Sequence, residues 1–352
     1  MPLQRLRVGL SGCGAVAALY HAPALQILEK EGVLRLSALF DPDAAAMAQI
    51  QAVFPTARAV SAFEELLSEP LDLVIIASPP VRHFQQVAAA LRAGFAVFCE
   101  KPLATRLVDG EALVALARQT GRMLAVAMVR RYFPATRVLA DLFRSGTIGE
   151  VREFHCFEGG PFDWPVRSPT YFNREVSGGG ALMDIGVHAL DLLGWWFGDC
   201  TTLSYEDDAM GGVEAECRLA LAYGEIAGEL RLSRMWHRPN RYEILGTRGR
   251  ASWTVNEAEH VEVQFAGAAY QLRATIHEGA HPAANFHQSV LDQLRAVTAV
   301  VAGEPGEIVA GQDTLPVLAL IERCYRDRKL LRMGWLEPEE RRAVERLAGV
   351  PA

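Results

Sequence analysis

The sequence lacks the features that would mark a secreted, membrane-spanning or nucleic-acid-binding protein. None of its six cysteines lies in a Cys-x-x-Cys pair, which favours free thiols in a reducing compartment such as the cytoplasm. No stretch reaches the roughly 18 apolar residues of a membrane span. Lysine and arginine number 35 against 42 acidic residues, a formal net charge of −7, so no basic field draws the protein to nucleic acid or to a membrane. The partner that these absences leave is a small molecule.

Low-complexity tracts and internal repeats are absent as well. Half of the 352 residues are hydrophobic and 22% are charged, which is the composition of a globular chain and argues against disorder. At about 150 residues per domain, this length corresponds to about two domains.

The N-terminal segment has two interpretations. Arg5 and Arg7 precede an apolar run, and residues 10–13 (Leu-Ser-Gly-Cys) resemble a bacterial lipoprotein cleavage site. Glycines interrupt the run, however, and the same residues fit a nucleotide-binding loop. We therefore favour the loop.

Short apolar runs alternate with helical patterns up to residue 129. The runs are continuous, as expected of strands covered on both faces. They are Arg7–Leu10, Leu34–Phe40, Leu73–Ala77, Ala96–Cys99 and Leu124–Val129. The helical stretches are Pro42–Phe54, Val81–Arg92 and Leu107–Gln119, with Gly94 and Gly121 as left-handed stops. This rhythm predicts an α/β domain over residues 1–129, with a parallel, doubly wound sheet.

The pattern changes after Pro134, where residues 130–352 are expected to form a second, α+β domain. A helix is predicted over Ala135–Arg144, and two helical regions close the chain, Asn285–Val301 and Gln312–Arg328. The predicted strands are Val151–Phe157, Glu214–Tyr223, Glu225–Arg234, Tyr242–Leu245 and His260–Phe265. Turn signals join them, so we expect a large, mostly antiparallel, open sheet.

A glycine-rich segment follows the first predicted strand and opens a helix. This is the context that a Gly-x-Gly-x-x-Gly/Ala dinucleotide fingerprint requires. Gly12 allows the tight turn, Gly14 lets the backbone approach a pyrophosphate, and Ala17 permits close helix packing. The helix N-terminus offers N–H donors to the anion. We expect the cofactor to contact Gly12, Cys13, Gly14, Ala15 and Val16.

Asp41 ends the second predicted strand, 24 residues beyond Ala17. An acidic side chain there accepts from the ribose hydroxyls and repels a 2′-phosphate. Asp43 adds a second negative charge, and no Arg or Lys follows before Arg58. These charges favour NAD over NADP. Asp41 could instead only cap the helix that starts at Pro42, but one side chain can both cap this helix and bind the ribose.

A loop of Ala77, Ser78 and Pro79 follows the third apolar run. Proline holds such a loop extended, so it could pass under the nicotinamide ribose. His83, at the start of the next helix, is either a further cofactor contact or a plain surface residue.

Glu100 and Lys101 follow the fourth run, again at the carboxyl end of a strand. A lysine in this place can donate a hydrogen bond and stabilise a developing alkoxide. The alternative is a solvated surface lysine.

Three consecutive glycines precede Asp184 and His188. On a helix, positions i and i+4 share one face, so the carboxylate and the imidazole could meet. Such a pair is suited to proton transfer near neutral pH. It could also be a capped helix with a buried polar pair, or two metal ligands that lack a third.

Together these motifs resemble the family of glucose-fructose oxidoreductase, inositol dehydrogenase and MocA. The motifs are Gly-x-Gly-x-x-Ala, Glu100-Lys101-Pro102 and Gly-Gly-Gly-x-x-x-Asp-x-Gly-x-His, in this order and at these distances. The resemblance spans nearly the whole chain. The resemblance implies an N-terminal Rossmann domain that binds NAD(P) and a C-terminal sheet that forms homodimer or homotetramer contacts. It also implies oxidation or reduction of a secondary alcohol on a sugar or cyclitol.

By this resemblance Lys101, Asp184 and His188 form the reaction centre. His188 is the candidate general acid/base, Lys101 orients the hydroxyl, and Asp184 orients the other two. Glu100 and Lys101 would also contact the cofactor. The expected reaction is hydride transfer from a carbinol carbon to nicotinamide while His188 removes the hydroxyl proton.

A polyol substrate is expected to contact the reaction centre and four further residues. These are Arg130, after the last predicted strand of the first domain, and Trp164, Tyr171 and Asn173 before the glycines. Their side chains can stack on a polyol and hydrogen-bond to it, although an ordinary aromatic surface loop would look the same.

Two other functions stay open. A family variant could use tightly held NAD transiently for redox-neutral glycoside cleavage or epimerisation. The second alternative is a noncatalytic nucleotide-binding regulator, for which the residues of the reaction centre would be superfluous. No metal is expected, because Pro282 interrupts the spacing of His277, His281 and His287 and no other ligands complete a shell.

Overall fold

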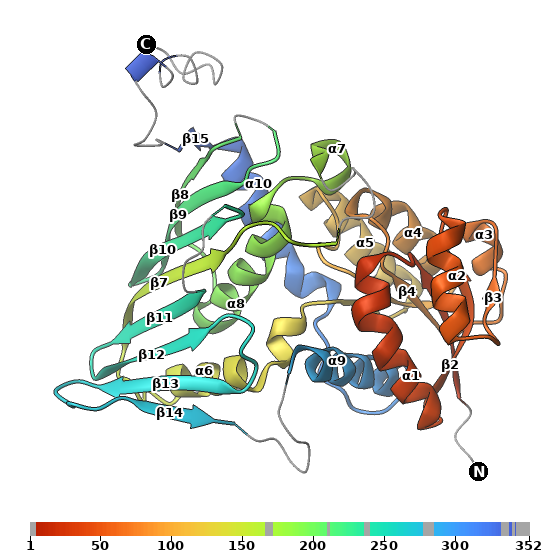
Figure 1. Ribbon diagram of the computed structural model, residues 1–352, viewed down its shortest axis with the longest axis horizontal. Helices are drawn as coiled ribbons and strands as arrows, with labels where there is room; N and C mark the ends of the chain where they lie inside the picture. Colours follow the sequence, from red (N-terminus) through yellow and green to blue (C-terminus); the bar gives the residue numbers. More distant parts are fainter. Residues whose placement is uncertain are drawn as a thin grey trace. The chain divides into compact units, whose positions relative to one another are not determined.

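The computed structural model describes residues 5–165, 172–209, 212–235, 240–276, 285–331, 338–339 and 342. The chain forms two compact units, each built on one sheet. Figure 1 shows their strands and helices. Each unit is described below by itself.

A six-stranded parallel sheet forms the first unit. Its strand order, β3-β2-β1-β4-β5-β6, is that of a dinucleotide-binding fold. The strands are β1 (Leu6–Ser11), β2 (Leu34–Phe40), β3 (Arg58–Ala59), β4 (Leu73–Ile76), β5 (Ala96–Cys99) and β6 (Leu124–Val126). All of β4 is buried, as a strand covered on both faces requires. The predicted α/β fold is confirmed. Among its strands, only the two-residue β3 was not predicted, because it contains no apolar run.

Helices connect these strands, and α2, α4 and α5 lie where the sequence pattern placed them, whereas the short α3 was not predicted. They are α1 (Ala22–Lys30), α2 (Ala44–Val53), α3 (Phe63–Leu66), α4 (Pro80–Arg92) and α5 (Leu107–Thr120). Gly94 and Gly121 have φ of +89° and +65°, so both predicted helix stops adopt the left-handed conformation.

A late part of the chain also packs on the first unit. It comprises α9 (Phe286–Val301) and a short turn of 3-10 helix, η5 (Gly311–Thr314). The ring of Tyr20 lies 4.6 Å from that of Phe286, and Arg295 pairs with Glu31 at 2.7 Å. The compact units therefore differ from the predicted domains, 1–129 and 130–352. Residues Asn285–Leu318 belong to the first unit, in which these contacts hold α9 against α1.

The second unit contains a nine-stranded mixed sheet in the order β14-β13-β12-β11-β7-β10-β9-β8-β15. Its strands are β7 (Val151–Gly159), β8 (Thr202–Asp207), β9 (Glu216–Tyr223), β10 (Ile226–Ser233), β11 (Arg241–Gly246), β12 (Gly249–Thr254), β13 (His260–Phe265), β14 (Leu272–Thr275) and β15 (Lys329–Leu330). Neighbours run antiparallel except β7 with β10 and β8 with β15. The predicted, mostly antiparallel sheet is confirmed.

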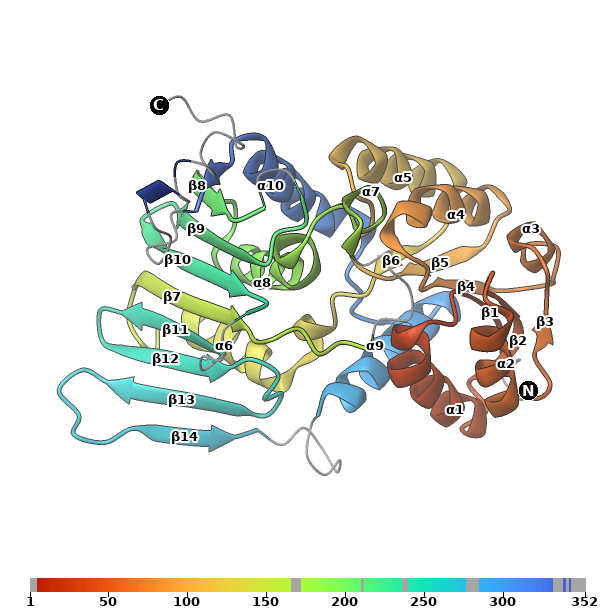
Figure 2. The ribbon, with the colours of Figure 1, turned by 45° about the horizontal axis from the view of Figure 1, so that its top comes forward.

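Helices cover one face of this sheet. They include α6 (Pro134–Arg144) and α8 (Val187–Phe197), seen behind the strands in Figure 2. The ring of Phe197 stacks on Phe154 of β7 at 6.1 Å, and Trp196 meets Tyr242 of β11 edge-on at 6.2 Å. In the described part of the chain the opposite face of the sheet carries no helix. The short α7 (Arg174–Ser177) and α10 (Leu315–Arg326) complete the helices named here.

Two findings bear on the environment of the protein. Across the ranges that the structure describes, no helix is both long and apolar enough to cross a membrane. All six cysteines are unpaired thiols.

Candidate active site

The glycine-rich loop after β1 turns sharply into a helix. Gly12 has φ of +96°, and a Cβ there would lie 2.4 Å from the backbone of Ala77, so only glycine fits. The N–H of Ala18 bonds to the carbonyl of Gly14, which begins the helix through Ala15 and Val16 and the π-helical turn η1 (Ala17–His21). The loop has the turn and the helix start that the fingerprint predicted.

The backbone at Gly14 is not covered by other parts of the chain that the structure describes. A Cβ added at Gly14 would meet no atom within 4 Å, so the backbone is open to an approaching phosphate. The Cys13 side chain is fully buried, and burial together with the charge of Asp41 raises the pKa of its thiol to about 12.

Asp41 is tied to the loop that it was expected to complement. Its Oδ2 accepts the N–H of Cys13 at 2.6 Å, and its Oδ1 accepts the N–H of Asp43 at 2.7 Å. Each carboxylate oxygen has a further lone pair, so the side chain can still accept from ribose hydroxyls. Asp43, rather than Asp41, caps α2. The helix cap therefore belongs to Asp43, and for Asp41 the nucleotide contact stays a prediction.

The loop after β4 packs against the glycine-rich loop. The N–H of Ala77 bonds to the carbonyl of Ser11 at 2.7 Å, and Ser78 Oγ donates to Gln86 at 2.6 Å. Pro79 caps α4 with an extended backbone. His83 is fully buried, so it is not the plain surface residue of the alternative interpretation.

Glu100 and Lys101 lie at the end of β5, and the peptide bond from Lys101 to Pro102 is cis. Glu100 Oε2 accepts the N–H of Lys101 at 3.2 Å, and Oε1 lies 2.8 Å from Nε2 of His21. Burial raises the pKa of Glu100, but the hydrogen bond from His21 and the charges of His21 and Lys101 outweigh it, so the pKa falls below its ordinary value. Glu100 is therefore an ionised acceptor. Sequence reasoning missed His21, since a lone histidine in an apolar helix carries no signal.

Asp184 and His188 begin a helix of the second unit. Asp184 lies in a π-helical turn, η4 (Leu182–Gly186), and His188 in the first turn of α8. The segment is therefore not the regular α-helix from which the i, i+4 pairing was argued. Both side chains are partly exposed.

The glycines before this helix are explained by what packs against them. A Cβ at Gly180 would lie 2.1 Å from the carbonyl oxygen of Glu214, and one at Gly179 would overlap Tyr325. Glu214 caps the helix from a distance in sequence: its carbonyl accepts from Ala181 and its Oε1 from Leu182, both at 2.9 Å. The Tyr325 hydroxyl donates to the same Oε1 at 2.7 Å. Burial raises the pKa of Glu214 despite these bonds.

Arg234 forms an ion pair with Asp184. It lies one residue beyond β10, and its guanidinium also stacks on the ring of Phe162 at 5.1 Å. Sequence reasoning missed this residue, although an arginine at the end of a predicted strand was a usable signal. A guanidinium in contact limits the orientations of the Asp184 carboxylate.

Replacing Arg234 with glutamine should lower kcat/KM by about tenfold, because the contact that orients the Asp184 carboxylate is lost. The measurement is kcat/KM with the alcohol substrate. The control, Arg144→Gln, removes an exposed pair with Asp141 on α6 and should leave kcat/KM unchanged. An unchanged kcat/KM in the Arg234 variant would contradict the role.

The remaining substrate candidates are dispersed. Arg130 is buried in a 3-10 turn, η2 (Val129–Tyr132), and Trp164 is partly exposed beyond β7. The Asn173 side chain caps α7 by accepting the N–H of Glu175. Tyr171 lies outside the described residues, as do His277 and His281. Substrate contacts at these positions stay a prediction.

Two family models match the sequence. Residues 6–128 match the oxidoreductase family with an NAD-binding Rossmann fold, and residues 136–252 match the GFO/IDH/MocA C-terminal domain. A dTDP-3,4-didehydro-2,6-dideoxy-alpha-D-glucose 3-reductase of Saccharopolyspora spinosa is 33% identical over 251 residues, which are 70% of this chain and 73% of the relative.

Solved structures share the fold. A 3-ketoreductase from Actinomadura kijaniata, in complex with NADP and TDP-benzene, has a TM-score of 0.79 at 24% identity and covers 94% of this chain and 99% of its own. A levoglucosan dehydrogenase, in complex with NADH and levoglucosan, has a TM-score of 0.80 at 20% identity and covers 92% and 98%. One neighbour holds NADP and the other NADH, so NAD(P) is common to them and neither form is preferred.

Proposed function

This chain belongs to the Gfo/Idh/MocA family of oxidoreductases, and we propose that it is an NAD-dependent dehydrogenase or reductase acting on a CH–OH group of a sugar, sugar derivative or cyclitol. The observation that carries the proposal is the arrangement of the first unit. The open glycine-rich loop, Asp41 and Lys101 follow β1, β2 and β5 of one parallel sheet. Ligands of such sheets bind beyond the carboxyl ends of the strands.

The residues of this chain would divide the work as follows. When bound, the nicotinamide supplies the carbon that accepts or returns a hydride. His188 takes the hydroxyl proton as the C–H bond breaks and the carbonyl forms, and returns it in the reverse direction. Lys101 donates a hydrogen bond to the same oxygen and offsets its developing negative charge. Asp184, held by Arg234, orients its neighbours.

The test is absorbance at 340 nm with NAD or NADP against inositols, free sugars, sugar acids and sugar phosphates. NADH formation with one class, abolished in His188→Ala, would support the proposal and name the substrate. Bound cofactor in the purified protein, with turnover of a glycoside or epimer but no reduction of added NAD, would favour the redox-neutral alternative instead.

We propose NAD rather than NADP as the preferred coenzyme. Asp41→Asn removes the charge that repels a 2′-phosphate, while the amide oxygen can still accept the N–H of Cys13. The ratio of kcat/KM for NAD over NADP should fall by about tenfold. Asp141→Asn, an exposed aspartate on α6, is the control for loss of one negative charge. An unchanged ratio in the Asp41 variant would refute the preference.

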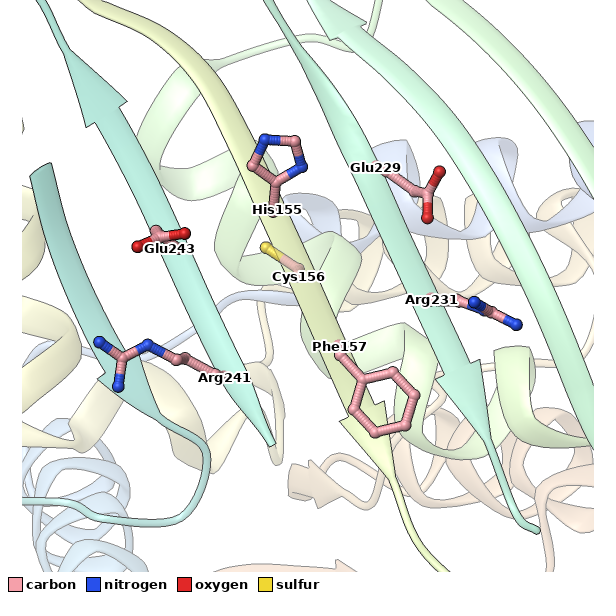
Figure 3. Close-up of a pocket in the computed structure, with 7 residues that line it drawn as sticks. All are labelled: His155, Cys156, Phe157, Glu229, Arg231, Arg241 and Glu243. Atoms are coloured by element: carbon pink, nitrogen blue, oxygen red, sulfur yellow. The ribbon is translucent and has the colours of Figure 1, made fainter. Parts of the chain in front are cut away.

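We also propose a homodimer or homotetramer formed through the open face of the nine-stranded sheet. This face has a pocket of about 340 Å³, and Figure 3 shows the side chains that line it. It is lined by His155, Cys156, Phe157, Glu229, Arg231, Arg241 and Glu243. Many charges here are paired within the chain, Arg231 with Glu216 at 2.9 Å and Arg241 with Glu262 at 2.8 Å, so two such faces would repel each other little.

Phe157→Glu should shift the mass measured by sedimentation toward that of the monomer, because it replaces an aromatic ring on the middle strand of this sheet with a carboxylate that an interface would have to desolvate. Tyr270→Glu, exposed in the turn between β13 and β14, is the matched control. A monomeric wild-type protein would refute the assembly.

We also propose that the enzyme is located in the cytoplasm, because its unpaired thiols fit a reducing compartment.

A further inference from the structure

His83 lies between two loops of the first unit. Its ring, on α4, has no exposed surface. Nδ1 lies 2.7 Å from the carbonyl oxygen of Pro102, and Nε2 lies 2.8 Å from that of Ser78. Ser78 belongs to the loop after β4, and Pro102 directly follows Lys101 at the end of β5. One ring therefore bridges the ends of two neighbouring strands.

The two contacts cannot both be hydrogen bonds of a neutral ring. A carbonyl oxygen only accepts, and a neutral imidazole has a single N–H. Burial lowers the pKa of His83; Lys101 adds to this effect, while the two carbonyls and the Glu100 carboxylate oppose it. The ring is therefore neutral at neutral pH. It donates to one carbonyl and turns a lone pair toward the other.

The surroundings decide which nitrogen holds the proton. The contact with Pro102 is buried, whereas the contact with Ser78 is only partly buried. An unmade hydrogen bond is more costly where water cannot replace the partner. The proton therefore belongs on Nδ1, where it bonds to Pro102.

We propose that His83 is a positioning residue for Lys101, and that its Nδ1–H holds the carbonyl of Pro102 and so fixes the backbone next to the lysine. The proposal takes the catalytic role of Lys101 from the proposed function. It extends a restraint already seen on the other side, where His21 holds Glu100 and Glu100 accepts the N–H of Lys101. The residues before and after the lysine are thus each held by a buried histidine.

Two variants separate the nitrogens of the ring. In His83→Asn the amide nitrogen takes the place of Nδ1, and in His83→Gln it takes the place of Nε2. Val87→Ala is the matched control, because Val87 is fully buried one turn further along α4 and contacts neither loop carbonyl through a polar atom. It reports what a loss of packing in this helix does by itself.

The readout needs no substrate, because this chain contains only three lysines, Lys30, Lys101 and Lys329. Reductive methylation with ¹³C-formaldehyde gives one signal for each lysine and one for the N-terminal amine, and Lys101→Arg assigns the signal of Lys101. The chemical shift and titration of this signal report the surroundings of the ammonium group. The dissociation constant of NAD is measured beside them.

His83→Asn should keep the titration midpoint of Lys101, and His83→Gln should move it by about 0.5 pH unit or more, as the lysine leaves its fixed surroundings. Val87→Ala should leave the midpoint in place. The proposal is overturned if His83→Gln matches the wild type, if both His83 variants move the midpoint equally, or if Val87→Ala moves it as much.

A measurement on the wild-type protein covers the case in which a variant does not fold. Nitrogen-15 spectra of the imidazole ring should show the neutral tautomer protonated at Nδ1, and a proton on Nε2 would overturn the proposal. Neither experiment depends on turnover. Failure here would leave the dehydrogenase activity standing, and failure to find an alcohol substrate would leave these results unaffected.

Discussion

Lys101→Met is expected to lower kcat/KM for the alcohol substrate by about 10³-fold, because it removes the donor that offsets charge on the reacting oxygen. Methionine keeps the length of the side chain and its apolar part, so the loop after β5 should keep its shape. The dissociation constant of NAD should change only a few-fold. Steady-state rates at 340 nm and quenching of protein fluorescence by NADH measure the two quantities.

The control for this variant is Lys30→Met. Lys30 is exposed at the end of α1, and its replacement should leave both kcat/KM and coenzyme affinity unchanged. Near-normal turnover in Lys101→Met would remove the lysine from the reaction centre. A loss of NAD binding equal to the loss of activity would instead assign Lys101 to the cofactor alone.

Gly180→Ala is expected to destabilise the helix that carries Asp184 and His188. The added methyl group would lie 2.1 Å from the carbonyl oxygen of Glu214, which accepts the N–H of Ala181. Overpacking of this kind costs about 2–3 kcal/mol, which corresponds to a fall in Tm of about 5–10 °C. Because the obstacle is backbone, no change of rotamer can relieve it. Thermal unfolding followed by circular dichroism measures the effect.

Gly194→Ala, in the helix that follows Gly180, is not expected to destabilise the protein. Gly194 lies within α8, and a Cβ there would meet no atom within 4 Å. Alanine favours the helix, so stability should stay equal or rise by up to about 1 kcal/mol. Equal losses in both variants would mean that glycine at position 180 is not required by the approach of Glu214.

The first unit was predictable because its signals are local. Continuous apolar runs placed the strands of the parallel sheet, and glycines at the right spacing placed the phosphate-binding turn. The second unit was predicted less completely. Strands β8, β12, β14 and β15 were not predicted from the sequence pattern. In β14 all four residues are exposed, so the strand has no alternation of buried and exposed positions.

The candidate site divides in the same way. Motif residues such as Gly12, Asp41 and Lys101 stand at positions that a single segment specifies. The residues that hold them do not: His21 reaches Glu100 across 79 positions, and the side chain of Glu214 reaches back 32 positions to Leu182. A lone buried histidine or glutamate carries no periodic or spacing signal, so only the folded chain reveals its partner.

By itself, the sequence determined the class of both folds and the glycine-rich turn, because hydrophobic periodicity and glycine spacing act within a few residues along the chain. The family followed from the resemblance of its motifs to those of known proteins. Only the tertiary structure decided which groups are tied together. It paired Asp184 with Arg234, gave the glycines before the helix their reason in Glu214 and Tyr325, and placed α9 against α1. These arrangements depend on contacts between distant segments, whose geometry is set by how whole elements pack.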